Sequence, residues 1–184
     1  MTESPAASTF TPSPQAWMDM ALGRFIRSMP VLESLLFLTA SAATGKSIVD
    51  QENATVTGAI EDIERHLRRF PRGDRLSLGK AMVDARSVIP VRHNLVHGQW
   101  SEVEGRPMTF VSILPIRSRK SARRLLERDD VSVAEGVTAE EPTSLRLTFN
   151  RDLILSVRET ATTLSTWLDE SLDAWEAHFR VTDP

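Results

Sequence analysis

The chain has 184 residues, of which 26% are charged and none is cysteine. This length favours one domain, or two at most, and the lack of cysteine excludes a disulfide scaffold, a cysteine-ligated metal site and thiol catalysis. The net charge of −3 conceals a polarised layout, because residues 65–128 carry 15 basic and 5 acidic residues.

Arginine outnumbers lysine by 19 to 3. A guanidinium can bind two phosphate oxygens at once, which an ammonium group cannot do. The basic middle of the chain therefore favours an RNA or nucleotide partner, although the same arginines could pair with the protein's own acidic helices.

Membrane and export signals are not evident in the sequence. The longest apolar-rich stretch, residues 31–43, is interrupted by Glu33 and by hydroxyl residues, and it falls short of the roughly 18 residues of a membrane-spanning helix. The N-terminus has no basic region followed by an apolar one. We therefore expect a cytoplasmic protein with no membrane partner.

The first part of the chain predicts an arm and two helices. Residues 1–12 are rich in Ser, Thr and Pro, which predicts a disordered arm. Ser13 and Pro14 then form a helix start, a hydroxyl N-cap followed by proline at the first helical position. Apolar residues recur at every fourth position up to Pro30, which is expected to break or restart the helix before a second, buried helix ends near Gly45.

Two further helices follow. Residues 53–70 predict a third helix that Pro71 ends, and residues 78–97 predict a fourth. Pro90 should kink the fourth helix, and Gly98 stands where a helix C-terminal stop belongs.

The hydrophobic period then changes to that of strands. Residues 100–104 and 108–114 flank a turn and predict a β-hairpin, and residues 145–149 alternate apolar and polar, which predicts a third strand. Between them, residues 117–128 are strongly basic, whereas residues 129–141 are acidic and predict a loop.

Asn150 caps a long last helix, whose apolar residues keep a spacing of three or four as far as Phe179. The sequence thus predicts a mainly α fold, a bundle of about five helices with a small antiparallel hairpin or three-stranded sheet inserted before the last helix. We expect one helical domain over residues 13–180, with the β insertion at about residues 99–149 and a tail at residues 181–184.

The candidate site is the end of the fourth predicted helix. Arg92, Asn94 and two of the four histidines, His93 and His97, lie within six residues there. The two histidines are four residues apart, which places them about 40° apart around a helix axis, whereas Arg92 lies about 140° from His97.

This pattern resembles the signature of the HEPN (higher-eukaryote and prokaryote nucleotide-binding) superfamily. The matching residues are Arg92, the polar His93, three further residues and His97, near the end of a late helix in an α-bundle. The glycine that follows, the hairpin with Trp100 and the final amphipathic helix also resemble that family. The resemblance covers residues 17–179 in architecture and about seven residues in detailed motif.

The resemblance implies a metal-independent endoribonuclease that needs no cofactor and acts as a homodimer, with the motifs of two protomers meeting in a cleft. Arg92 would hold the scissile phosphate and stabilise charge in the transition state. His97 would act as general base for attack by the ribose 2′-hydroxyl, or as general acid for the leaving group. His93 would support these two groups, and Asn94 would help to orient them.

The resemblance also implies the toxin or effector of a bacterial defence or toxin–antitoxin module, with an antitoxin protein as partner. A separate group of cations is a candidate RNA-tracking arm. These cations are Arg117, Arg119, Lys120, Arg123 and Arg124. The same run could equally be a solvated surface.

Other interpretations of the motif stay open. Arg92 could be a structural anchor that pairs with a carboxylate on a neighbouring helix, with His97 as a C-capping side chain. The chain could be a non-catalytic HEPN-like domain that binds nucleotide, RNA or a protein. The two histidines could ligate a metal, but no third ligand is evident in the sequence, and we expect no metal.

Overall fold

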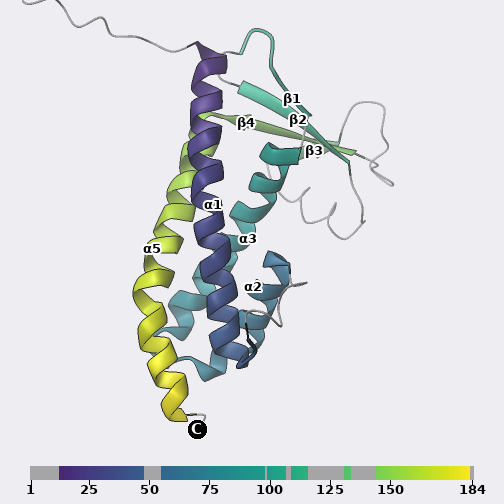
Figure 1. Cartoon of the computed structure of the whole chain (residues 1–184). Helices are drawn as coiled ribbons and strands as arrows, with labels where there is room; N and C mark the ends of the chain where they lie inside the picture. The colour runs from purple at the N-terminus through teal and green to yellow at the C-terminus, as the bar shows by residue number, and fades with distance from the viewer. Residues whose placement is uncertain are drawn as a thin grey trace, which may run out of the picture.

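The computed structural model describes residues 13–47, 55–97, 99–106, 109–115, 131–133 and 144–182. The arm predicted for residues 1–12 and the basic segment 117–128 lie outside them. The described residues form a mainly helical bundle with a small antiparallel sheet at one end (Figure 1).

The described part of the chain contains four α-helices and one 3-10 turn, where the sequence predicts about five helices. They are α1 (Pro14–Thr44), α2 (Val56–Arg65), the 3-10 turn η2 (Leu67–Arg69), α3 (Arg75–His97) and α5 (Arg151–Thr182). The difference arises at the N-terminus, where the two helices predicted on either side of Pro30 are one helix. At the other end, α5 includes the first two residues of the predicted tail.

Helix α1 begins and ends at the capping residues predicted from its sequence. The Ser13 hydroxyl accepts a hydrogen bond of 3.2 Å from the Ala16 N–H, and Gly45 ends the helix in the left-handed conformation with φ 71°. These two predicted boundaries are confirmed.

The break predicted at Pro30 is wrong, because α1 continues through it. Met29 and Leu32, on either side of this proline, are both buried in the core. The continuous buried face holds the helix together, and this packing outweighs the one backbone hydrogen bond that proline cannot make.

Helix α1 also has a property that the sequence prediction missed. Within Gln15–Thr44 it contains an 18-residue stretch with a mean hydropathy of 1.2, so the helix is long and apolar enough to cross a membrane by length and composition alone. In the bundle, Phe25, Leu32 and Leu36 of this helix are buried against the other helices. A core helix of this kind meets the same criterion as a membrane span.

The three long helices pack along their apolar stripes. Helices α1 and α5 lie side by side and run in the same direction, from the sheet to the opposite end of the bundle, while α3 runs back towards the sheet (Figure 1). The predicted stripe of α5 is confirmed, since seven of its residues are buried: Ile154, Val157, Ala161, Leu164, Leu168, Trp175 and Phe179. The predicted cap is confirmed too, because the Asn150 side chain accepts a 2.9 Å hydrogen bond from the Leu153 N–H.

The sheet has four strands, all paired antiparallel, in the order β1-β2-β4-β3. They are β1 (Gln99–Glu102), β2 (Thr109–Pro115), β3 (Val131–Val133) and β4 (Ser144–Asn150). The predicted hairpin and the predicted strand before the last helix are confirmed as β1–β2 and β4.

Strand β3 corrects the prediction of three strands. It lies at the start of the segment predicted to be an acidic loop, and it pairs with β4 from Val131 opposite Leu147 to Val133 opposite Leu145. Three residues are too few to show a period, so only pairing with β4 distinguishes this strand from a loop.

Candidate functional site

The end of α3 is anchored in the core by two apolar residues of the motif region. Val91 and Leu95 are 1% and 2% exposed, respectively. The predicted kink residue Pro90 lies inside the helix, which continues to His97. Arg92 and His93 therefore project from a helix end whose opposite side is fixed, and the sheet begins directly beyond that end at Gln99.

Arg92 forms an ion pair with Glu33 of α1. The distance between Arg92 Nε and Glu33 Oε1 is 3.5 Å, and the two side chains are 31% and 22% exposed. Among the described residues, Glu33 is the one carboxylate within ion-pair distance of this guanidinium. A guanidinium has five N–H donors, so a contact through Nε alone engages a small part of its capacity.

Another arginine of α3 is held much more tightly. Arg86 forms a two-point contact with Glu64 of α2, with 3.1 Å between Nε and Oε1 and 2.6 Å between Nη2 and Oε2. This hydrogen bonding to Glu64 raises the pKa of Arg86 above its ordinary value. Arg86 is therefore a structural link between two helices, whereas in the described part of the chain Arg92 makes one longer contact.

The remaining motif residues occupy the last two turns of α3. His93 is exposed to solvent. Asn94 and His97 belong to the helical backbone, of which His97 is the last residue, and their side chains lie outside the described structure. The helix thus brings the four motif positions to one end of the bundle, and of these Arg92 contacts Glu33.

Glu33 is the residue of this region that sequence analysis did not identify as part of the site. The signal was present, because Glu33 is the one carboxylate in the apolar-rich stretch 31–43. A partly buried carboxylate needs a cation or hydrogen-bond donors nearby, so a basic partner on a neighbouring helix could have been predicted. The sequence could not reveal which of the 22 cations it was.

The predicted RNA-tracking cations lie outside the described residues. These are Arg117, Arg119, Lys120, Arg123 and Arg124. The described part of the chain also contains no group of three or more metal-ligating side chains.

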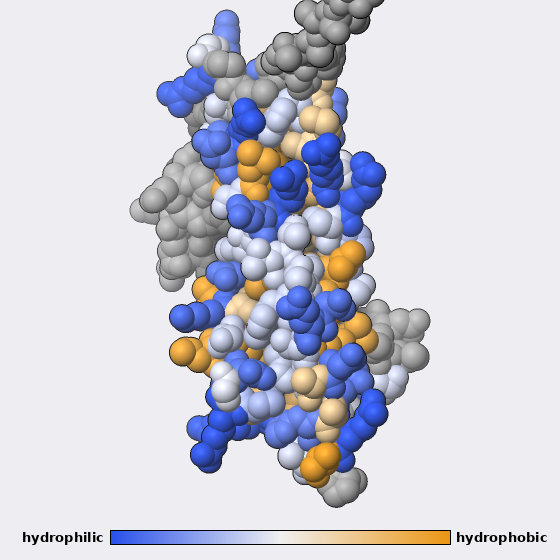
Figure 2. Space-filling model, turned by 90° about the vertical axis from the view of Figure 1, so that its left-hand side faces the viewer, coloured by the Kyte–Doolittle hydropathy of each residue, from blue (hydrophilic) through white to orange (hydrophobic). Residues whose placement is uncertain are grey.

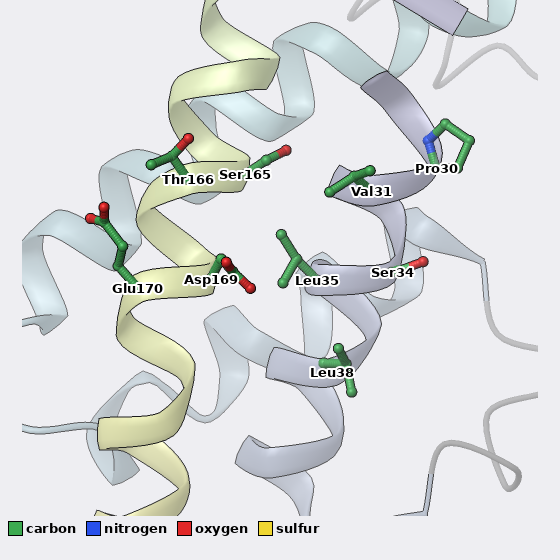
Figure 3. Close-up of a pocket in the computed structure, with 9 residues that line it drawn as sticks. All are labelled: Pro30, Val31, Ser34, Leu35, Leu38, Ser165, Thr166, Asp169 and Glu170. Carbon is green, nitrogen blue, oxygen red and sulfur yellow. The ribbon is translucent and has the colours of Figure 1, made fainter. Parts of the chain in front are cut away.

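A groove on the described surface lies away from the motif. It lies between α1 and α5, has a volume of about 580 Å³, and is drawn in Figure 3. Its α1 side is mainly apolar, with Val31, Leu35 and Leu38, and its α5 side carries Asp169 and Glu170. With two carboxylates and no cation in its lining, this groove is unsuited to a phosphate ligand.

The face that includes α5 shows hydrophobic residues scattered among hydrophilic ones, without one continuous apolar area (Figure 2). Trp175, on the apolar stripe of α5, is fully buried within its own chain. Its ring packs edge-on against Phe70 and Trp167, at centroid distances of 5.1 and 5.4 Å.

Comparison of this chain with protein-family models, with curated proteins and with solved structures found no match. The chemistry of the end of α3 and the resemblance of its motif are the features of this chain that bear on function.

Proposed function

We propose that this protein is a HEPN-like, metal-independent endoribonuclease whose reacting groups are Arg92 and His97. The observation that carries the proposal is the contrast between Arg92 and Arg86. Arg86 is committed to Glu64 by two hydrogen bonds, whereas among the described residues the Arg92 guanidinium has one longer contact of 3.5 Å, and the two side chains are similarly exposed, at 30% and 31%. Glu33 can hold the guanidinium in place through Nε while the two terminal amino groups bind a phosphate.

The reaction uses the RNA's own nucleophile. The ribose 2′-oxygen attacks the adjacent phosphorus, the bond from phosphorus to the 5′-oxygen breaks, and a 2′,3′-cyclic phosphate and a 5′-hydroxyl result. Arg92 stabilises the negative charge that develops on the phosphate oxygens. His97 takes the proton of the 2′-hydroxyl or supplies one to the leaving oxygen, with His93 and Asn94 as supporting residues.

The biological setting and assembly belong to the same proposal. They comprise a homodimer with two motifs facing one cleft, an antitoxin partner, and a role as toxin or effector in bacterial defence. Their support is the motif resemblance alone.

A second candidate function is a non-catalytic HEPN-like domain that binds nucleotide, RNA or protein. The ion pair between Arg92 and Glu33 favours it, because a guanidinium that anchors α3 to α1 has a structural role without any substrate. In that case the motif fixes the end of α3 beside the sheet.

Cleavage of a labelled, structured RNA in EDTA separates these candidates. The wild-type chain should cut the RNA, and His97→Ala should lower the rate by about 10²- to 10⁴-fold. Arg92→Ala should also abolish cutting. Arg86→Ala is the matched control, because it removes an arginine from the same helix and should keep most of the activity.

Thermal unfolding of the same variants completes the test. Intact RNA with the wild-type chain, together with measurable RNA binding, would support the binding domain. If neither cutting nor binding occurs and Arg92→Ala changes thermal stability alone, the motif is structural.

A further inference from the structure

The end of the bundle opposite the sheet collects cationic side chains. Helix α1 ends there, α3 begins there and α5 ends there (Figure 1). The turn between α2 and α3 carries five arginines and one aspartate within residues 65–75. These arginines fall into two groups according to what their guanidinium groups contact.

Two of the arginines hold the turn together. Arg75 donates from Nε to the Phe70 carbonyl at 2.9 Å and from Nη2 to the Arg68 carbonyl at 2.6 Å. Arg69 donates to the Ala43 carbonyl at the end of α1, and its guanidinium lies 5.7 Å from the centre of the Phe179 ring. These contacts fix the backbone of η2 against α1 and α5.

Other cations on this fixed backbone face solvent. Arg68 and Arg72 are exposed, and within the described chain neither side chain makes an ion pair or a hydrogen bond. Lys46 is likewise exposed, just beyond the end of α1 to which Arg69 is bonded. Arg65 differs, because Asp62 neutralises it in an ion pair.

We infer that Arg68, Arg72 and Lys46, here called the cationic end, bind the phosphate backbone of an RNA chain. Exposed cations on a rigid turn gain counterion-release energy from phosphates, and they have no internal carboxylate to give up. The choice of RNA as the polyanion rests on the proposed function. This surface lies outside both the motif and the segment 117–128.

The cationic end and the motif lie near opposite ends of α3. Seventeen residues of α3 separate Arg75 from Arg92, which corresponds to about 25 Å along the helix. That length spans about seven stacked nucleotides of one strand. The cationic end therefore contacts phosphates remote from the scissile one and adds affinity without touching the reacting atoms.

An anionic membrane is the competing partner for a cationic surface. Stable attachment to a bilayer also needs apolar area to insert. Leu76, 73% exposed, is the large exposed apolar residue closest in sequence to Arg72. Val181, at the end of α5, is also exposed, at 81%. Two separate side chains of this size supply little such area, so RNA is the favoured partner.

The test measures binding to a single strand of about 20 nucleotides with 2′-O-methyl riboses, which cannot be cleaved by 2′-hydroxyl attack. Fluorescence anisotropy over a salt series gives both affinity and salt slope. The double variant Arg68→Gln/Arg72→Gln should weaken binding about tenfold near physiological salt and reduce the slope by about 1.4, since each phosphate contact on a single strand contributes about 0.7.

The matched control is Arg24→Gln/Arg27→Gln, which removes two exposed cations from α1. It should leave affinity and slope almost unchanged, and Arg68→Lys/Arg72→Lys should retain most of the slope. Equal losses in the two glutamine variants, no loss in Arg68→Gln/Arg72→Gln, or no binding by the wild-type chain would each overturn the inference. The inference would also be overturned if Arg68→Gln/Arg72→Gln weakened binding to phosphatidylserine vesicles and left RNA binding unchanged. That result would identify a membrane-binding surface instead.

The two proposals can fail separately. A chain that never cuts RNA but loses RNA affinity in Arg68→Gln/Arg72→Gln would refute the nuclease and support the cationic end. A chain that cuts RNA, but whose RNA affinity is unchanged in Arg68→Gln/Arg72→Gln, would support the nuclease and refute the cationic end.

Discussion

The two ends of α3 use arginine in different ways. At its start, Arg75 and the neighbouring Arg69 donate to backbone carbonyl groups. Near its other end, Arg92 faces a side-chain carboxylate, that of Glu33, at 3.5 Å. A carbonyl belongs to the fold and cannot be exchanged for a ligand, whereas a carboxylate contact can share the guanidinium with an incoming phosphate.

This difference separates arginines that build the molecule from arginines available for binding. The backbone contacts of Arg69 and Arg75 lie beside an aromatic cluster in which Phe70 packs edge-on against Trp175 and Phe179, each at 5.1 Å. The motif end has apolar anchors, Val91 and Leu95, and among the described residues its arginine has one ion-pair partner, Glu33. We therefore expect substitutions at the start of α3 to act on stability and those near its end to act on function.

The largest expected effect on stability is that of Trp175→Ala. Trp175 is fully buried, and its Nε1 donates a 2.8 Å hydrogen bond to the Asp74 carboxylate just before α3. Loss of this ring should lower the free energy of unfolding by about 3–5 kcal/mol, as measured by urea denaturation. A loss below about 1 kcal/mol would mean that the aromatic cluster does not support this end of the bundle.

A smaller effect distinguishes structural from exposed arginines. Arg75→Ala removes two hydrogen bonds to carbonyl groups and should lower the free energy of unfolding by about 1–2 kcal/mol. Arg68→Ala, seven residues earlier, should change it by less than about 0.5 kcal/mol, because that guanidinium has no partner among the described residues. Similar losses for both variants in urea denaturation would contradict the proposed division of roles.

The smallest expected effect on stability concerns Arg92 and Glu33. Both side chains are partly exposed, so a double-mutant cycle of Arg92→Ala and Glu33→Ala should give a coupling energy of at most about 1 kcal/mol. Glu33→Ala should also reduce RNA cleavage less than Arg92→Ala, because Glu33 only positions the guanidinium. A coupling well above this value, with equal effects of both variants on activity, would indicate a purely structural ion pair.

Local patterns were sufficient to predict much of the fold. Ser13 and Asn150 cap helices because a side-chain oxygen next to an apolar helical stripe satisfies free backbone N–H groups. The hairpin and the stripe of α5 follow from periods of two and of three to four residues. Pro30 misled the prediction because a local rule for proline ignores the buried face that continues on both sides of it.

The candidate site was predicted only in part, because local patterns do not reveal contacts between distant segments. The sequence by itself identified Arg92, His93, Asn94 and His97 as one helix end, since all four positions fall within two turns just before the glycine expected to end the helix. Tertiary packing alone brought Glu33 of α1 to Arg92, paired β3 with β4, and divided the arginines of residues 65–75 into bonded and exposed groups. Contacts between segments distant in sequence depend on how whole helices pack, and no local pattern of residues encodes that arrangement.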